Sequence, residues 1–219
     1  MKRLIIFDLD GTLLNTIGGI GCACNEMLEH YGLPLHEIEE YNYFVGNGSL
    51  MLIKRALPED KAADEPFLRQ AKEYYLKCYR ANLARETRPY DGMPELLQEL
   101  SRRGVTMAVA SNKFDDGAKF LVPHFFPDIK FAAVEGQKPG GRLKPDPDII
   151  SDAIGHSFPG GIERSEVLYV GDCEVDIDSA TNSGLDYVLV DWGFRGRKGL
   201  EAAGAKCVID TPAELLRFI

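Results

Sequence analysis

Two aspartates, Asp8 and Asp10, follow the apolar run Leu4 to Phe7 and precede a Gly11-Thr12 turn. Side chains two positions apart on an extended chain point to the same side, so both carboxylates are expected to share one pocket. Close carboxylates repel unless one is protonated or a cation lies between them, and oxygen ligands suit Mg²⁺ better than zinc. The pattern therefore predicts a magnesium site, with simple capping of the following helix as the alternative.

A second acidic cluster, Gly171 to Asp176, follows the apolar run Val167 to Val170. Asp172 could complete the metal site, but an acid between a strand and a helix is also an ordinary N-cap, and both interpretations stay open. Cys173 lies inside this cluster with no histidine nearby in sequence, so it is interpreted as a small filler and not as a nucleophile.

Groups that can bind an anion follow two further predicted strands. Ser111 and Asn112 come after Val105 to Ala110 and can donate hydrogen bonds to a phosphoryl oxygen. Lys144 precedes a predicted helix, where its charge can neutralise a nucleophile and a phosphate. Each feature alone is weak, but an acid pair, a hydroxyl with an amide, a lysine and an acid cluster at the ends of four strands together indicate an active site.

The elements that position these residues read as a doubly wound α/β fold with a mostly parallel sheet. Short apolar runs typical of buried parallel strands alternate with helical segments at Met93 to Arg103 and Pro147 to Ile154. The predicted strands are Leu4 to Phe7, Val105 to Ala110, Ile129 to Val134, Val167 to Val170, Tyr187 to Val190 and Cys207 to Ile209.

One segment interrupts the alternation between strands and helices. Residues 16–85 show helical periodicity and turn signals but no convincing strand. Helices are expected at Ile17 to Tyr31, Leu50 to Leu57 and Glu65 to Leu83. The sequence thus predicts a catalytic core formed by residues 1–15 and 86–219, with residues 16–85 inserted as a helical domain.

The composition excludes several classes of protein. The 219 residues carry a net charge of −9 with no long basic run, which argues against nucleic-acid and membrane-surface partners. The five cysteines lack the regular spacing of a disulfide framework, and the apolar run at Leu4 is too short for a signal peptide or a membrane span. A cytoplasmic protein is expected, as a monomer or homodimer.

The ordered motifs resemble those of the haloacid dehalogenase (HAD) superfamily of phosphohydrolases, which has a Rossmann-like core. The segment Asp8-Leu9-Asp10-Gly11-Thr12 is similar to its first motif, and Ser111-Asn112 to its second. Lys144-Pro145 resembles the third motif, and Gly171-Asp172 with Asp176 the fourth. The resemblance covers nearly the whole chain, and it identifies the inserted segment with the helical cap of the family.

The resemblance implies a role for each residue of the motifs. Asp8 would be the nucleophile that forms an aspartyl phosphate, and Asp10 would be the general acid and base. Asp8, Asp10 through its backbone carbonyl, and Asp172 would hold Mg²⁺, with Asp176 orienting the ligands. Ser111 and Lys144 complete the expected catalytic residues, while Thr12 and Asn112 are expected to bind the substrate, a small phosphorylated metabolite. The second acid, Asp10, disfavours dehalogenation, because true dehalogenases lack it.

Within the superfamily, the inserted segment resembles that of phosphoglycolate phosphatases. The similarity lies in Val45 to Gly48 and the following Lys54-Arg55 pair, so Gly46, Asn47, Gly48 and Arg55 are expected to contact a substrate such as 2-phosphoglycolate. The glycines could equally form a plain turn, and the cationic pair a solvated helix face. A β-phosphoglucomutase-like phosphotransferase, an inorganic pyrophosphatase and a non-enzymatic phosphoacceptor module are the alternatives.

Overall fold

The computed structural model describes residues 1–219, which divide into two compact units. The first unit contains residues 1–15 and 89–219, and the second contains residues 16–88. Two short strands, β2 (Leu14–Asn15) and β3 (Arg88–Pro89), pair where the chain passes from one unit to the other. No helix has the length and apolar character needed to cross a membrane.

The first unit is built on a six-stranded parallel sheet with the order β5-β4-β1-β6-β7-β8. This confirms the predicted α/β fold. The strands are β1 (Leu4–Phe7), β4 (Thr106–Phe114), β5 (Ala133–Gln137), β6 (Val167–Gly171), β7 (Asp186–Val190) and β8 (Val208–Ile209). Two strand predictions were wrong in their bounds. The strand expected from Ile129 begins only at Ala133, and the strand expected to end at Ala110 continues to Phe114, so Ser111 and Asn112 lie within it.

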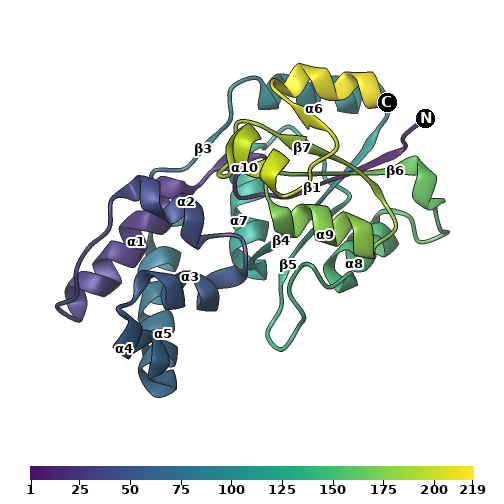
Figure 1. The fold of residues 1–219 in the computed structure, drawn as a ribbon. Coiled ribbons are helices and arrows are strands. Elements are labelled where there is room, and N and C mark those ends of the chain that lie inside the picture. The colour runs from purple at the N-terminus through teal and green to yellow at the C-terminus, as the bar shows by residue number, and fades with distance from the viewer. The chain divides into compact units, whose positions relative to one another are not determined.

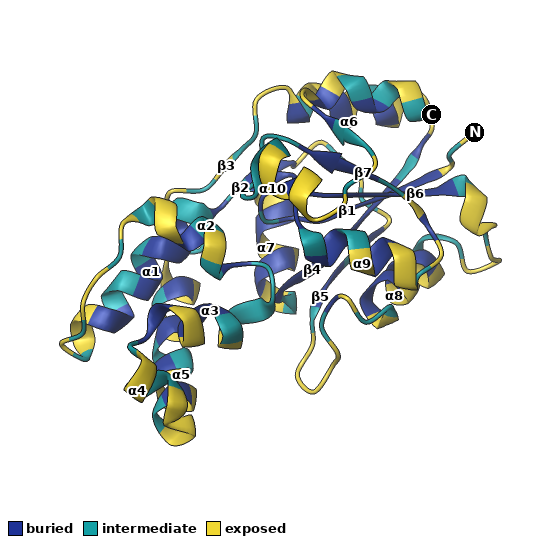
Figure 2. Cartoon of the chain, viewed as in Figure 1, coloured by how far each residue is buried: buried dark blue, intermediate teal, exposed yellow.

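Helices cover both faces of this sheet (Figure 1), and its central strands are therefore buried on both sides. β1 consists of Leu-Ile-Ile-Phe with no exposed surface, as expected for a central parallel strand (Figure 2). The helices of this unit are α6 (Met93–Arg102), α7 (Asp115–Phe125), α8 (Asp148–Ser157), α9 (Glu174–Asn182) and α10 (Gly196–Ala202), with the 3-10 helices η2 (Arg164–Glu166) and η3 (Pro212–Phe218).

The second unit is mainly helical. Its longest helix, α5, begins after Asp64, whose side chain accepts a hydrogen bond from the backbone of Phe67 at 3.2 Å as an N-cap. The apolar stripe of α5 packs against α1 and α3. The elements are α1 (Ile17–His30), η1 (Ile38–Glu40), α2 (Tyr41–Phe44), α3 (Gly48–Ala56), α4 (Glu59–Ala63) and α5 (Glu65–Ala81).

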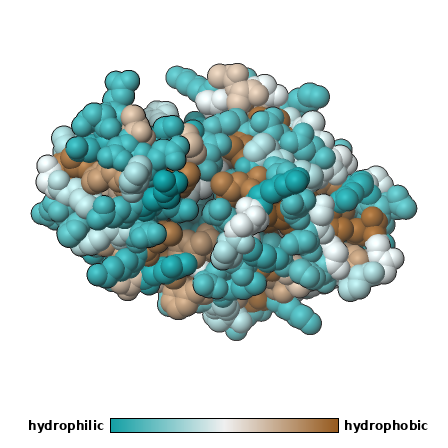
Figure 3. Space-filling view, turned by 90° about the horizontal axis from the view of Figure 1, so that it is seen from below, coloured by the Kyte–Doolittle hydropathy of each residue, from teal (hydrophilic) through white to brown (hydrophobic).

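The surface is largely hydrophilic. The face drawn in Figure 3 carries hydrophobic side chains only in small groups among polar ones. Among the large apolar side chains, few are well exposed: Met1, Leu35, Tyr43, Leu50 and Phe120. Scattered exposure of this kind is normal for a globular protein.

Candidate active site

Asp8 follows β1 directly, at the carboxyl end of the middle of the sheet. Its backbone N–H donates to Val170 of the neighbouring β6 at 2.8 Å, and its side chain is almost completely buried. The turn after Asp10 needs a glycine, because Gly11 has a φ of +90° and a side chain there would collide with the carboxylate of Asp172. The first acid pair and the second acid cluster therefore meet at Gly11.

Lys144 is the cation at the centre of this group. Its Nζ lies 2.8 Å from Asp8 Oδ1, 2.9 Å from Asp176 Oδ1 and 2.9 Å from the hydroxyl of Tyr169. Burial disfavours the charged ammonium, but the carboxylates of Asp176 and Asp8 outweigh this effect and hold the pKa of Lys144 well above its ordinary value. The surroundings thus favour the charged form of Lys144, which contacts the expected nucleophile.

The carboxyl group of Asp8 is balanced between opposing influences. Burial raises its pKa most, the nearby ammonium of Lys144 lowers it, and the charge of Asp176 raises it again. The outcome is a pKa of about 6, above the ordinary value of 3.8. A carboxylate in this position is therefore poorly solvated, which favours reaction with an electrophile or binding of a cation.

Asn112 fixes the backbone of Lys144. Its side-chain oxygen accepts from Lys144 N at 2.7 Å, and its side-chain nitrogen donates to Lys144 O at 3.0 Å. Asn112 and Lys144 are both buried. The amide of Asn112 thus satisfies the N–H and the C=O of Lys144, as the backbone of a neighbouring strand would. The neighbouring Ser111 is also buried, and its hydroxyl accepts from Lys113 N at 3.3 Å.

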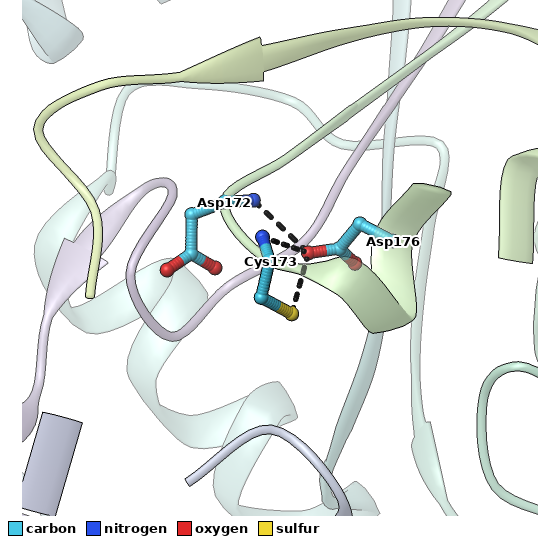
Figure 4. Close-up of side chains that lie close together, drawn as sticks. All are labelled: Asp172, Cys173 and Asp176. Atoms are coloured by element: carbon cyan, nitrogen blue, oxygen red, sulfur yellow. Dashed lines mark hydrogen bonds between the residues drawn. The ribbon is translucent and has the colours of Figure 1, made fainter. Parts of the chain in front are cut away.

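Asp176 is surrounded by hydrogen-bond donors (Figure 4). One oxygen, Oδ2, accepts from the backbone of Asp172 at 3.0 Å, and from the backbone and thiol of Cys173, both at 3.1 Å. The other oxygen faces Lys144 and Tyr169. Burial raises the pKa of Asp176, but the charge of Lys144 and these hydrogen bonds outweigh burial and lower the pKa. Asp176 also completes the capping box of α9, whose N-cap residue is Cys173 and not Asp172, for which capping was the alternative interpretation.

Asp172 differs from Asp176, because it is buried among like charges. Burial, then Asp176, then Asp8 raise its pKa well above the ordinary value. Its Oδ2 accepts from Phe194 N at 2.7 Å, in the loop after β7. Gly193 in that loop packs so closely that a side chain there would overlap Asp172 and lie 2.7 Å from Gly11 O. The loop after β7 therefore fixes the carboxylate of Asp172.

Asp10 pairs with a second lysine that motif analysis did not select. Lys113 Nζ lies 3.0 Å from Asp10 Oδ1 and 3.3 Å from Asp10 Oδ2. The lysine side chain is only 2% exposed, compared with 18% for Asp10. The site thus contains two buried ammonium groups, and each contacts one member of the first acid pair.

The charges of the site leave room for a divalent cation. The site contains four carboxylates, those of Asp8, Asp10, Asp172 and Asp176, and two ammonium groups, so the formal net charge of these groups is −2 when all are ionised. One divalent cation would balance this charge, and hard oxygen ligands suit Mg²⁺. Thr12 Oγ1 is in addition a buried hydroxyl without a hydrogen-bond partner, as expected of a group that meets a ligand.

The chain also matches a known protein family. Residues 5–190 match the family described as haloacid dehalogenase-like hydrolase. The chain belongs to this family. This hydrolase is 30% identical to the phosphoglycolate phosphatase of Haemophilus influenzae over 99% of its own length and 98% of the relative. It is also 30% identical to the phosphoglycolate phosphatase of Mesorhizobium japonicum, covering 90% of this chain and 86% of that protein.

Solved structures give the same result. A proposed phosphoglycolate phosphatase from Lactobacillus delbrueckii subsp. bulgaricus is 31% identical and superposes with a TM-score of 0.90, over 98% of this chain and 97% of that one. The resemblance of this hydrolase to the HAD superfamily and to phosphoglycolate phosphatases is thereby confirmed. The protein is an HAD-family phosphoric monoester hydrolase.

The residues expected to bind substrate in the inserted segment lie in the unit of residues 16–88. Gly46 and Gly48 have φ values of +112° and +79°, so the turn between α2 and α3 requires glycine. The guanidinium of Arg55 donates to Phe44 O at 2.8 Å and to Asn47 Oδ1 at 2.8 Å. In this structure Arg55 therefore braces the turn, and the predicted contact with a substrate carboxylate stays a prediction.

Sequence reasoning missed three contributors to the site of this hydrolase. Lys113 directly follows the Ser111-Asn112 motif, and a charged residue at the end of a buried strand was the available signal. Tyr169 lies in the fully buried β6, where a phenol needs a hydrogen-bond partner. The loop from Trp192 to Arg195 carried no recognisable signal, because its contact with Asp172 depends on the conformation of the loop after β7, the strand that pairs with β6.

Proposed function

We propose that this hydrolase is a Mg²⁺-dependent phosphatase that acts on a small phosphomonoester through an aspartyl phosphate on Asp8, with 2-phosphoglycolate as its substrate. The observation that supports the proposal most directly is the buried contact of Lys144 Nζ with Asp8 Oδ1 at 2.8 Å. Lys144 contacts Oδ1 of Asp8, and we assign the other oxygen, Oδ2, as the nucleophile.

The reaction would occur in two transfers. In the first, Asp8 Oδ2 attacks phosphorus, the ester P–O bond breaks, and the leaving oxygen takes a proton from Asp10. In the second, Asp10 takes a proton from water, the water oxygen attacks phosphorus, and the acyl phosphate bond breaks to release inorganic phosphate and the carboxylate of Asp8. Each transfer begins with the protonation state of Asp10 that the other leaves behind.

Asp8, Asp172 and the backbone carbonyl of Asp10 would hold the Mg²⁺ ion. When bound, the cation would neutralise charge that develops on the phosphoryl oxygens. Asp176 would act indirectly, because its carboxylate accepts from the backbone of Asp172 and from the ammonium of Lys144. Lys144 would add a fixed positive charge to the phosphoryl pocket.

Three further core residues would complete the phosphoryl pocket. The buried hydroxyl of Thr12 has no partner and can donate to a phosphoryl oxygen, as can the hydroxyl of Ser111. Asn112 would act mainly by holding the backbone of Lys144 in place. These assignments rest on hydrogen-bonding capacity and burial.

We further propose that the unit of residues 16–88 is the cap that selects the substrate. Its turn from Gly46 to Gly48, braced by Arg55, would approach the organic part of the ester. The preference for 2-phosphoglycolate is supported by the names of the relatives that match nearly the full length of the chain.

A phosphate-release assay over small esters tests the proposal. With Mg²⁺, 2-phosphoglycolate should be hydrolysed faster than β-glucose 1-phosphate or pyrophosphate, and EDTA should remove the activity. Asp8→Asn should lower kcat by at least ~10³-fold, because the nucleophile is gone. Substantial turnover by the Asn variant would contradict the assigned nucleophile, and a preference for the sugar phosphate would contradict the assigned substrate.

A further inference from the structure

Lys113 is buried at the active site without any role in the chemistry described above. Its side chain is 2% exposed and its Nζ contacts both carboxylate oxygens of Asp10, at 3.0 and 3.3 Å. Removing an ammonium group from water is unfavourable unless specific partners compensate for the loss. The position of Lys113 therefore calls for a functional explanation.

The local backbone is shaped so that Lys113 reaches Asp10. The pairing of β4 with β5 shifts in register between Ala110 and Phe114, the signature of a bulge or irregularity. A regular strand would direct Ser111, Asn112 and Lys113 alternately to opposite faces, whereas a bulge can re-aim a side chain. Asn112 bonds to the backbone of Lys144 and Lys113 bonds to Asp10, so adjacent side chains serve the same site.

The neighbouring strand holds this irregular segment in place. Gly136 of β5 lies so close that a side chain there would stand 2.7 Å from Lys113 O and 2.6 Å from Asp115 Cα. Its N–H donates to Asp115 Oδ1 at 3.1 Å. The backbone on which Lys113 is carried is therefore tightly packed, and the side chain of Lys113, only 2% exposed, is confined beside Asp10.

We propose that Lys113 is a positioning residue for the reaction, and that its ammonium holds the carboxyl group of Asp10 where the leaving oxygen must receive a proton. Contact with both oxygens restricts rotation of the carboxyl group about its Cβ–Cγ bond. Orientation of a proton donor matters most when the leaving group is a poor one, because an alkoxide must be protonated as the ester bond breaks. This inference rests on the proposed role of Asp10 as proton donor.

The proposal predicts a loss that depends on the leaving group. Lys113→Met should lower kcat/KM for the best alkyl phosphate of the wild-type enzyme by about 10²-fold or more. For 2,4-dinitrophenyl phosphate, whose leaving group needs no proton, the loss should stay below about 10-fold. Lys113→Arg, which can also contact both oxygens of Asp10, should recover most of the alkyl phosphatase activity.

Parallel kinetics on both esters for wild type, Lys113→Met, Lys113→Arg and Asp10→Asn test the inference. Lys119→Met, which removes an exposed lysine of α7, serves as the matched control and should behave as wild type. The double variant Asp10→Asn with Lys113→Met should be no worse on the alkyl ester than Asp10→Asn alone, because the two residues act as one unit. If Lys113→Met does not fold in urea titrations, Lys113→Gln takes its place.

Two outcomes separate failure of this inference from failure of the proposed function. Equal losses on both esters in Lys113→Met, with a selective loss in Asp10→Asn, would overturn the role of Lys113 and leave Asp10 as the proton donor. No selective loss in Asp10→Asn would instead overturn the proposed role of Asp10, on which the inference depends. Selective loss in both variants, absent from the control, would support the inference.

Discussion

Replacement of Lys144 by methionine removes the charge that compensates the buried carboxylates of the site. The ammonium contacts Asp8 and Asp176 at 2.8 and 2.9 Å, and its side chain is 2% exposed. Removing one partner from a buried ion pair costs about 3–5 kcal/mol, because the other charge stays buried without compensation. Since two carboxylates lose the same partner here, the free energy of unfolding should fall by an amount near the upper end, about 5 kcal/mol.

Urea unfolding at pH 7.5 in EDTA measures this loss, with Lys119→Met as the matched control. Lys119 makes an ion pair of 2.7 Å with Asp115, but its side chain is 51% exposed, so its replacement should change stability by less than about 1 kcal/mol. Mg²⁺ should restore part of the stability of Lys144→Met, because a divalent cation can compensate the same carboxylates. The activity with Mg²⁺ should stay about 10²–10³-fold below wild type.

A stability of Lys144→Met within about 1 kcal/mol of wild type in EDTA would refute the reasoning, because a buried charge cannot lose its partner at so small a cost. If the variant does not fold at pH 7.5, the measurement moves to pH 5. There Asp8, with a wild-type pKa of about 6, is mostly protonated and needs no cation. Absence of any recovery of folding at pH 5 would also contradict the argument.

Three further predictions concern the same site. The folded-state pKa of Asp8 is about 6, above the ordinary value of 3.8. The metal-free protein should therefore lose stability relative to Asp8→Asn as pH rises from about 4 to 6. A difference in stability between the two proteins that stays constant over this range would contradict the prediction. Gly193→Ala should weaken Mg²⁺-dependent activity by at least ~10-fold, because the new methyl group overlaps Asp172. Gly155→Ala, which adds a methyl group where the space is open, should keep full activity. Equal kinetics for the two variants would contradict the prediction. Tyr169→Phe should lower the free energy of unfolding by about 1–3 kcal/mol, since Lys144 and Asp176 lose a buried hydrogen-bond partner. An unchanged midpoint of urea unfolding would contradict this prediction.

The central strands and the acids that follow them could be predicted from sequence, because buried parallel strands are short, apolar and bounded by polar turns. β1 and β6 begin where their apolar runs begin, and Asp8 and Asp172 follow them closely. The start of β5 was missed, because the apolar residues of Ile129 to Ala132 resemble a strand although the strand itself begins at Ala133. Residues 129–132 are half-buried or exposed, so their apolar character indicates neither burial in the core nor membership of the strand.

The identity of the residues in the site could be predicted from the sequence better than the contacts that these residues make. Asn112 was expected on the phosphoryl group, yet its amide bonds to the backbone of Lys144, a contact across 32 positions of sequence. Arg55 was expected on a substrate carboxylate, yet it bonds to the turn beside it. In both cases residue type reveals hydrogen-bonding capacity, while the choice of partner depends on the irregular backbone that the sequence pattern does not describe.

The pairing of Asn112 with the peptide of Lys144 anchors this lysine independently of the loop that leads to it. Residues 138–143 are mostly exposed and include the turn at Gly140 and Gly141, whereas Lys144 is anchored through both its N–H and its C=O. Insertions at surface turns generally disturb a fold little when the flanking residues are held independently. A reporter peptide or affinity tag could therefore be spliced between these glycines without displacing the ammonium group, which offers a place to attach labels close to the chemistry.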